Sequence, residues 1–177
     1  MGESGDGYWS HLEITPGTGA GPAAELGPAA EPDGPPLSGP SLDAVKALVT
    51  LAAADGVAAE LQMPATRDRG WPASWSLPSA WLYVAGGGGV GLHRYDDDAE
   101  SEAQEAFRIA DTAQEALLES MPAVGRPTNW PPCPAHPTTH PLALAAGDDD
   151  DPRPRWTCPL TGDVVGVLTG GGIRSTP

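Results

Sequence analysis

The first segment of the chain that is rich in apolar residues has the spacing of a helix. From Leu42 to Ala52 they recur at intervals of three and four, which predicts a helix with Ser41 as its N-cap. The helix is expected to weaken at Asp55 and to end before Pro64, because proline lacks the N–H that continues a helix and its ring clashes with the preceding turn. The first folded element is therefore a helix beginning at residue 41.

A second helical pattern, over residues 99–121, is the most regular in the chain. One face carries an apolar stripe and the remaining positions are mostly charged, which predicts a long amphipathic helix. Acidic residues at its start suit the helix dipole, and Pro122 ends it. The predicted stripe consists of Ala103, Ala106, Phe107, Ala110, Ala113, Leu117 and Met121. Its small alanines allow close packing against a neighbouring element.

Alternating apolar and polar positions predict β-structure between and after these helices. Residues 80–85 and 90–95 are two β-prone runs joined by four glycines, a pattern typical of a β-hairpin with a loose turn. Residues 155–158 and 164–168 are further candidate strands. Residues 67–78 contain two tryptophans among prolines and serines without any period, so we expect a loop there.

Glycine and proline separate a folded region from loose ends. The 177 residues include 23 Gly and 21 Pro, a share at which aperiodic chains are usually partly disordered. Residues 1–40 contain too few large apolar side chains to offset the entropy of ordering, so we expect a disordered arm. The sequence predicts one small α+β domain over residues 41–168, with a Cys/His segment at 126–168, and a flexible tail over 169–177.

The charge of the chain narrows the classes of function. Nine Lys and Arg against 24 Asp and Glu give a net charge of −15, which makes nucleic acid an unlikely partner because phosphate-binding surfaces need clustered cations. No stretch has the roughly 20 apolar residues that span a bilayer. The N-terminus is acidic where a secretory signal is basic. We therefore expect a cytoplasmic protein with reduced cysteines and no membrane contact.

The strongest chemical signal is a group of cysteines and histidines near the C-terminus. Cys133 and His136 have the Cys-x-x-His spacing of a zinc knuckle, and Cys158 begins a similar Cys-Pro turn. Thr161 stands where that second turn would supply another ligand, but a threonine hydroxyl is a poor zinc ligand, so His140 is the candidate for the fourth position. The sequence predicts a structural zinc site of the zinc-knuckle kind, formed by Cys133, His136, His140 and Cys158.

Other interpretations of this group stay open. A proline follows each histidine and restricts its backbone to extended geometry, so the sequence does not establish that the four residues converge. A metal-free packing cluster of Trp, Pro and His, or a disulfide or redox pair, would also account for the pattern. A catalytic zinc is disfavoured because the chain has no His-Glu-x-x-His motif or similar pairing of ligands with a general base.

Taken together, these features favour a non-enzymatic protein. We expect a zinc-stabilised protein-interaction module whose protein partner the sequence does not identify. The first alternative is a small metal- or thiol-dependent enzyme that uses Cys133 and His136. The second is a nucleic-acid-binding zinc module, which has only four arginines in the C-terminal part to support it.

The segments WPPCPAHPTTHPL and WTCPLTG resemble a motif of short actinobacterial proteins that have no assigned activity. These proteins share a Trp-Pro-x-Cys-Pro-x-His-Pro core, a His-Pro-Leu step and a Trp-x-Cys-Pro return. The resemblance extends over about residues 80–168 and includes a helix with an acidic start. It implies a common family without an assigned activity and therefore adds no catalytic role.

Overall fold

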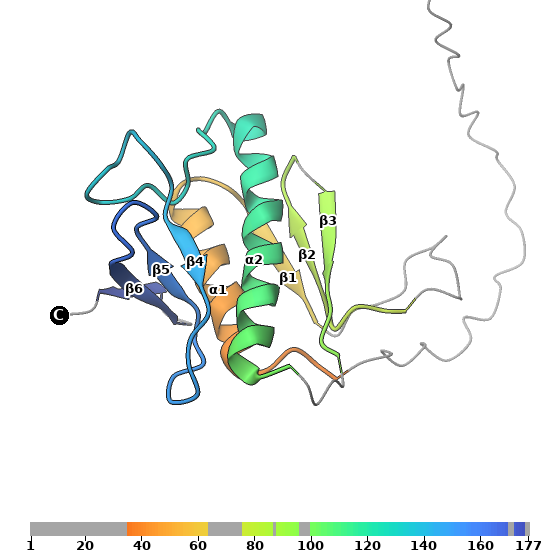
Figure 1. The fold of residues 1–177 in the computed structure, drawn as a ribbon. Coiled ribbons are helices and arrows are strands. Elements are labelled where there is room, and N and C mark those ends of the chain that lie inside the picture. The colour runs from red at the N-terminus through yellow and green to blue at the C-terminus, as the bar shows by residue number, and fades with distance from the viewer. Residues whose placement is uncertain (1–34, 64–75, 87, 96–99, 170–171, 176–177) are drawn as a thin grey trace, which may run out of the picture.

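Two helices lie between two antiparallel β-sheets in the computed structural model, which describes residues 35–63, 76–86, 88–95, 100–169 and 172–175 (Figure 1). The helices are α1 (Gly39–Ala54) and α2 (Glu102–Ser120), and a short 3-10 helix, η1 (Met121–Val124), extends α2. The predicted α+β class is therefore confirmed. No helix within the described ranges is long and apolar enough to cross a membrane.

The first sheet has the strand order β1 (Ala59–Gln62), β2 (Ala80–Val84), β3 (Gly88–Leu92). The second has the order β4 (Ala143–Ala145), β5 (Arg155–Thr157), β6 (Val164–Thr169), β7 (Gly172–Ser175). Helix α1 contacts β1, β6 and β7, and α2 contacts β2, β3 and β4. Each helix thus packs on both sheets.

The two helices run in the same direction and share the core. Ser41 and Glu105 bond near their N-terminal ends, while Asp55 and Met121 line one cavity near their C-terminal ends. The buried faces are rich in alanine, which allows the helix axes to approach closely. Fully buried residues of the two helices include Ala44, Ala47, Leu48, Ala52, Ala106, Ala110, Ala113 and Leu117.

The N-cap of helix α1 lies three residues earlier than the sequence predicted. Ser38 occupies the N-cap position, and Pro40 fits the first turn, where its missing N–H costs nothing. Ser41 is therefore not the N-cap, because its hydroxyl is buried and bonds to Glu105 instead. The helix ends at Ala54, close to the predicted weak point, and the chain then forms β1 where the sequence predicted a continuing helix.

Helix α2 begins at Glu102, with Ser101 as its N-cap. The Ser101 hydroxyl accepts the backbone N–H of Gln104, and the Gln104 side chain accepts the backbone N–H of Ser101, which forms a capping box. The predicted apolar stripe is buried except for Phe107, which is only half-buried. Ile109, which the predicted stripe left out, is buried.

The predicted hairpin is confirmed as β2 and β3, with Tyr83 opposite Gly89. A Cβ atom at Gly89 would lie 2.8 Å from two ring carbons of Tyr83. Since real Cβ atoms essentially never approach other atoms this closely, position 89 requires glycine while Tyr83 keeps its place. The glycine run is thus part of a strand as well as a turn.

The boundaries of the folded region are wider than the sequence predicted. Leu37 is buried and α1 begins at Gly39, so the arm predicted over residues 1–40 ends inside the fold. Gly172–Ser175 pair with β6 as β7, so residues 169–177 are not wholly a tail. A glycine-rich strand with one large apolar residue gives no alternation to detect. The remainder of the arm, residues 1–34, and most of the predicted loop, residues 64–75, lie outside the described residues.

Candidate metal centre

The loop that carries three of the candidate ligands follows η1 and leads into β4. Its two ends are joined by backbone hydrogen bonds: the N–H of Leu142 donates to the Pro131 carbonyl at 2.8 Å, and the N–H of Cys133 donates to the His140 carbonyl at 3.4 Å. Prolines in this loop have no N–H to donate, so these few bonds define its shape. The closed loop places Cys133 near His140.

Two successive turns bring the histidines back toward Cys133. The N–H of His136 donates to the Cys133 carbonyl at 3.0 Å, and the N–H of Thr139 donates to the His136 carbonyl at 3.1 Å. The ring centroids of His136 and His140 are 5.1 Å apart. The proline after each histidine, which left convergence open in the sequence, therefore does not prevent the two rings from approaching each other.

Cys158 comes from a different part of the chain, directly after β5. The N–H of Gly162 donates to the Cys158 carbonyl at 2.7 Å, and the N–H of Cys158 donates to the Asp163 carbonyl at 2.9 Å. Gly162 has φ of +76°, a left-handed conformation that favours glycine. This tight turn fixes the direction of the Cys158 side chain toward the loop.

The structure brings all four predicted site residues together. One ligand atom from each of Cys133, His136, His140 and Cys158 lies within 4.8 Å of the others. Nδ1 of His136 is 3.6 Å from the Cys133 sulfur and 3.5 Å from the Cys158 sulfur, and Nε2 of His140 is 3.8 Å from the Cys158 sulfur. Tetrahedral bonds of roughly 2.0–2.3 Å place ligand atoms about 3.5 Å apart. The cluster could therefore hold a metal ion.

A hydrogen bond orients the His140 ring for coordination. Its Nδ1 lies 2.7 Å from the Pro141 carbonyl oxygen, so Nδ1 carries the proton and donates it. The lone pair is then on Nε2, the atom that faces Cys158. Metal-binding histidines generally donate their second ring N–H in this way. Residue type and spacing predicted His140 as a candidate ligand, but only the loop geometry shows its bond to the Pro141 carbonyl.

Cys158 is electrostatically prepared to ionise. The Thr161 hydroxyl, the backbone N–H groups of Thr161 and Leu160, and the Cys133 thiol together lower the pKa of the Cys158 thiol to about 6, although burial opposes this change. The Thr161 hydroxyl also lies 2.7 Å from Oδ2 of Asp163. Its single proton can therefore be donated to the Cys158 sulfur or to the Asp163 carboxylate, but not fully to both. Thr161 is thus no ligand, but it favours the thiolate that a metal requires.

Both sulfur atoms are enclosed and the histidines are partly open. Cys133 is 0% exposed and Cys158 is 3% exposed, whereas His136 and His140 are half-buried. Both cysteines are free thiols. A metal ion at this site would therefore be shielded from solvent on its thiolate side.

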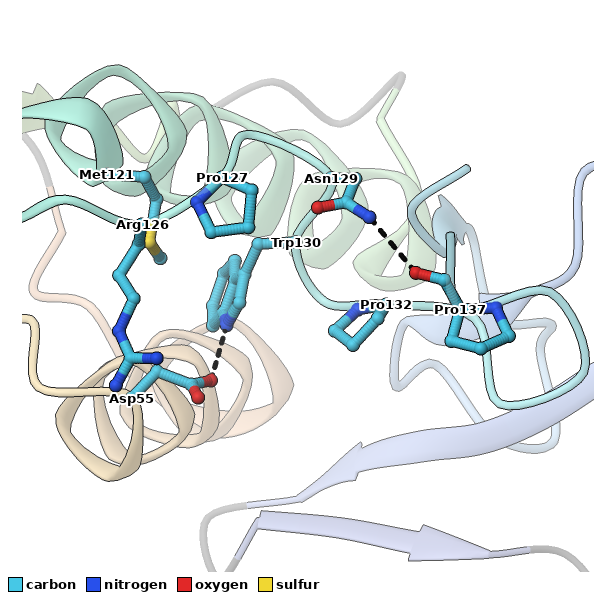
Figure 2. Close-up of a pocket in the computed structure, with 8 residues that line it drawn as sticks. All are labelled: Asp55, Met121, Arg126, Pro127, Asn129, Trp130, Pro132 and Pro137. Atoms are coloured by element: carbon cyan, nitrogen blue, oxygen red, sulfur yellow. Dashed lines mark hydrogen bonds between the residues drawn. The ribbon is translucent and has the colours of Figure 1, made fainter. Parts of the chain in front are cut away.

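One side-chain bond connects the metal-site loop to α1, and a second joins the start of the loop to its middle (Figure 2). Nε1 of Trp130 donates to Oδ2 of Asp55 at the end of α1, 2.8 Å away. Nδ2 of Asn129 donates to the Pro137 carbonyl at 3.1 Å, which ties the start of the loop to the turn that carries His136. The loop is thus fixed on both sides of Cys133.

No family model, curated protein or solved structure matches the chain. The resemblance to short actinobacterial proteins and the cytoplasmic location stay predictions. Function is therefore argued from the site itself.

Proposed function

We propose that the protein is a non-enzymatic protein-interaction module whose C-terminal segment is stabilised by one zinc ion bound to Cys133, His136, His140 and Cys158. The convergence of these four ligand atoms within 4.8 Å is the observation that carries the proposal. Two thiolates and two imidazoles are a common ligand set of structural zinc. The thiolates balance the charge of a divalent ion while the imidazoles stay neutral.

A structural role is supported by the number and burial of the ligands. The protein supplies all four positions of a tetrahedral site, whereas a catalytic zinc keeps one position open for water. The complete burial of Cys133 argues against the thiol-dependent alternative, because a nucleophile needs access to its substrate. Bound zinc would cross-link the loop of residues 130–142 to the turn after β5.

The turn at Cys158 supports an interaction role. Leu160, within the turn that Cys158 begins, is 65% exposed, and Val164, at the start of β6 just after the turn, is 44% exposed. Large apolar side chains that are exposed together often mark a contact surface. The net charge of −15 favours a partner whose contact surface is apolar with basic residues around it.

Metal content and stability test the zinc part of the proposal. We expect about one zinc per chain by elemental mass spectrometry of protein purified without chelator. Cys133→Ser and Cys158→Ser should each lose the metal and melt at a lower temperature. Thr138→Val is the matched control, because Thr138 is exposed in the same loop and supplies no ligand. Little metal in the wild type, with unchanged melting in both cysteine variants, would contradict the proposal.

The interaction part is tested with variants that keep the zinc. Proximity labelling in the source cells should recover a protein with the wild type that is lost with Leu160→Ser. Met63→Ser is the control, because Met63 is also an exposed large apolar residue but follows β1 in the other sheet. Equal recovery with Leu160→Ser and Met63→Ser would show that the Cys158 turn is not the contact surface.

A further inference from the structure

A cavity of about 310 Å³ lies between the end of α1 and the loop that leads to the metal centre. This volume is at the lower end of the range of small-molecule sites. Its apolar lining includes Met121 from η1, the indole of Trp130, and Pro132 and Pro137 from the loop. Figure 2 shows Arg126, Trp130 and Met121 on one side of the cavity and the two loop prolines on the other.

The cavity also contains two opposite charges that do not pair with each other. Asp55 accepts a hydrogen bond from Trp130 through Oδ2 alone. No described residue forms an ion pair with Arg126, although each of the other four arginines with described side chains has one. Those four pairs are Arg94–Glu105, Arg108–Glu100, Arg153–Asp151 and Arg155–Asp148. Arg126 and the second oxygen of Asp55 are therefore available to a ligand.

We propose that this cavity binds a free α-amino acid with an apolar side chain. The ligand carboxylate would bond to the Arg126 guanidinium and the ligand ammonium to the Asp55 carboxylate. The ligand side chain would pack on Met121 and the proline wall. Such a zwitterion matches both charges, whereas a simple anion is repelled by Asp55 and a simple cation by Arg126. Because the zwitterion has no net charge, the overall charge of −15 does not oppose its approach.

The cavity shares its wall with the metal centre. Pro132 directly precedes Cys133, Pro137 directly follows His136, and the Asn129 side chain bonds to the Pro137 carbonyl. The proposal goes beyond the metal-stabilised interaction module, and its test does not depend on the identity of the metal. It is carried out on the full chain as purified, with its metal content measured in parallel.

A titration with L-leucine, followed by two-dimensional NMR of the full chain, tests the proposal. The indole N–H of Trp130, assigned by its absence in Trp130→Phe, should shift in a saturable way because it lies in the cavity wall. N-acetyl-leucine lacks the ammonium group and leucinamide lacks the carboxylate. Each should bind at least about tenfold more weakly than leucine, since each leaves one cavity charge without a partner. Once the Trp130 signal is assigned, the comparison of the three ligands uses the wild-type protein alone.

Charge-removing variants complete the test. Arg126→Gln and Asp55→Asn should each weaken leucine binding by at least about tenfold, and Asp55→Asn keeps an oxygen that accepts the Trp130 N–H. Arg153→Gln, at an arginine outside the cavity, should bind leucine as the wild type does. The proposal is overturned if leucine gives no saturable shift, if leucinamide or N-acetyl-leucine binds equally well, or if Arg126→Gln leaves binding unchanged.

Discussion

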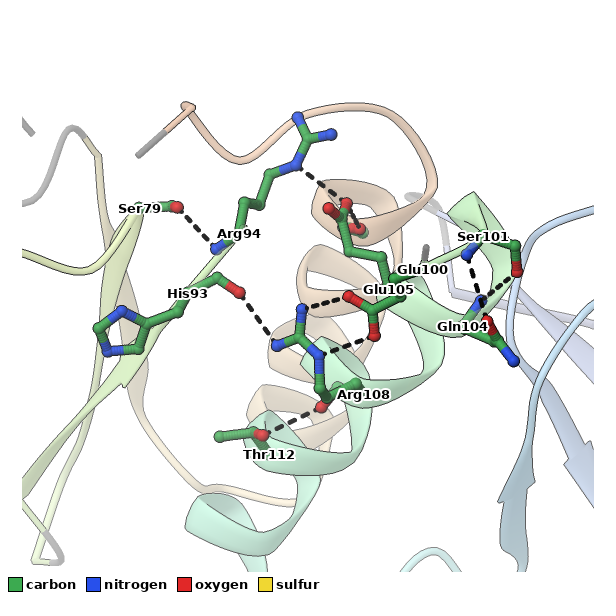
Figure 3. Close-up of polar contacts among 10 residues, drawn as sticks. Ser79, His93, Arg94, Glu100, Ser101, Gln104, Glu105, Arg108 and Thr112 are labelled. Atoms are coloured by element: carbon green, nitrogen blue, oxygen red, sulfur yellow. Dashed lines mark hydrogen bonds and ion pairs between the residues drawn. The ribbon is translucent and has the colours of Figure 1, made fainter. Parts of the chain in front are cut away.

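The hydroxyl of Ser41 on α1 donates a hydrogen bond to Oε1 of Glu105 on α2, 3.0 Å away. The same oxygen lies 2.9 Å from Nε of Arg94, which follows β3 (Figure 3). Arg94 also donates to the Pro36 carbonyl at 3.0 Å and to the Ser38 hydroxyl at 2.7 Å. One buried carboxylate therefore joins both helices, the first sheet and the segment before α1.

Removal of this carboxylate should destabilise the fold. Glu105→Ala removes the hydrogen-bond acceptor of Ser41 and the ion-pair partner of Arg94, so we expect the free energy of unfolding to fall by about 2 kcal/mol. Ser41→Ala removes one hydrogen bond and should cost about 1 kcal/mol. Urea denaturation measures both. The control is Glu102→Ala, an exposed carboxylate of the same helix turn, which should cost under about 0.5 kcal/mol. A similar loss at Glu102 would show that Glu105 acts through helix charge alone.

The two helix N-termini should respond differently to loss of their N-cap serines. Ser101→Ala removes the acceptor of the Gln104 N–H and should cost about 1 kcal/mol of unfolding free energy. Ser38→Ala should cost less, because the Ser38 side chain makes no cap bond and its hydroxyl accepts a bond from the partly exposed Arg94. Urea denaturation of the two variants and the wild type measures both losses of unfolding free energy. Equal costs would mean that the capping box contributes nothing specific.

The long periodic elements and the strands β5 and β6 could be predicted from the sequence, but the other short strands could not. Helix α2 and the β2–β3 hairpin have enough residues to display their period. The strands β1, β4 and β7 have three or four residues each, and their hydrogen bonds depend on a neighbouring strand rather than on their own pattern. The N-cap of α1 was misplaced because Ser41 fits a cap by type, while its hydroxyl is drawn inward by Glu105.

For the candidate metal centre, residue type and spacing singled out the four residues that the structure brings together, but their geometry needed the structure. The convergence of His136 and His140 depends on turns that the proline-rich sequence does not reveal. The bond from His140 to the Pro141 carbonyl and the effect of Thr161 on Cys158 depend on backbone direction. The charges at Asp55 and Arg126 were missed because the two residues are 71 positions apart in the sequence and only the fold brings them to one cavity.

The buried tryptophans Trp156 and Trp130 offer a matched pair of substitutions. Trp156 is 0% exposed and, among the described residues, its Nε1 has no hydrogen-bond partner, whereas Nε1 of Trp130 bonds to Asp55. Replacement by phenylalanine removes similar atoms at both sites. Trp130→Phe also strands a carboxylate acceptor, so it should cost about 1 kcal/mol more than Trp156→Phe. Trp156→Ala should cost about 3–5 kcal/mol because it empties the core beneath β5. Equal costs for the two phenylalanine variants, measured by urea denaturation, would contradict this assignment.

Zinc retention should depend on pH through Cys158. The folded protein lowers the pKa of this thiol from 9.0 to about 6, so its contribution to stability is fully present above pH 9 and is lost as the pH falls toward 6. A lower thiol pKa also lets the site hold its metal against proton competition. Thr161→Val keeps all four ligands but removes the hydroxyl that contributes most to the lowered pKa. It should therefore release zinc at a higher pH than the wild type.

A chromogenic chelator added to the full-length protein over a series of pH values measures this release. Thr138→Val is again the control, because it changes an exposed threonine of the metal-site loop and should leave the release curve in place. If the Thr161 hydroxyl stabilises the Cys158 thiolate, Thr161→Val shifts the zinc-release curve to higher pH and Thr138→Val does not. Coincident curves for all three proteins would mean that the backbone N–H groups of Leu160 and Thr161 are sufficient to maintain the thiolate.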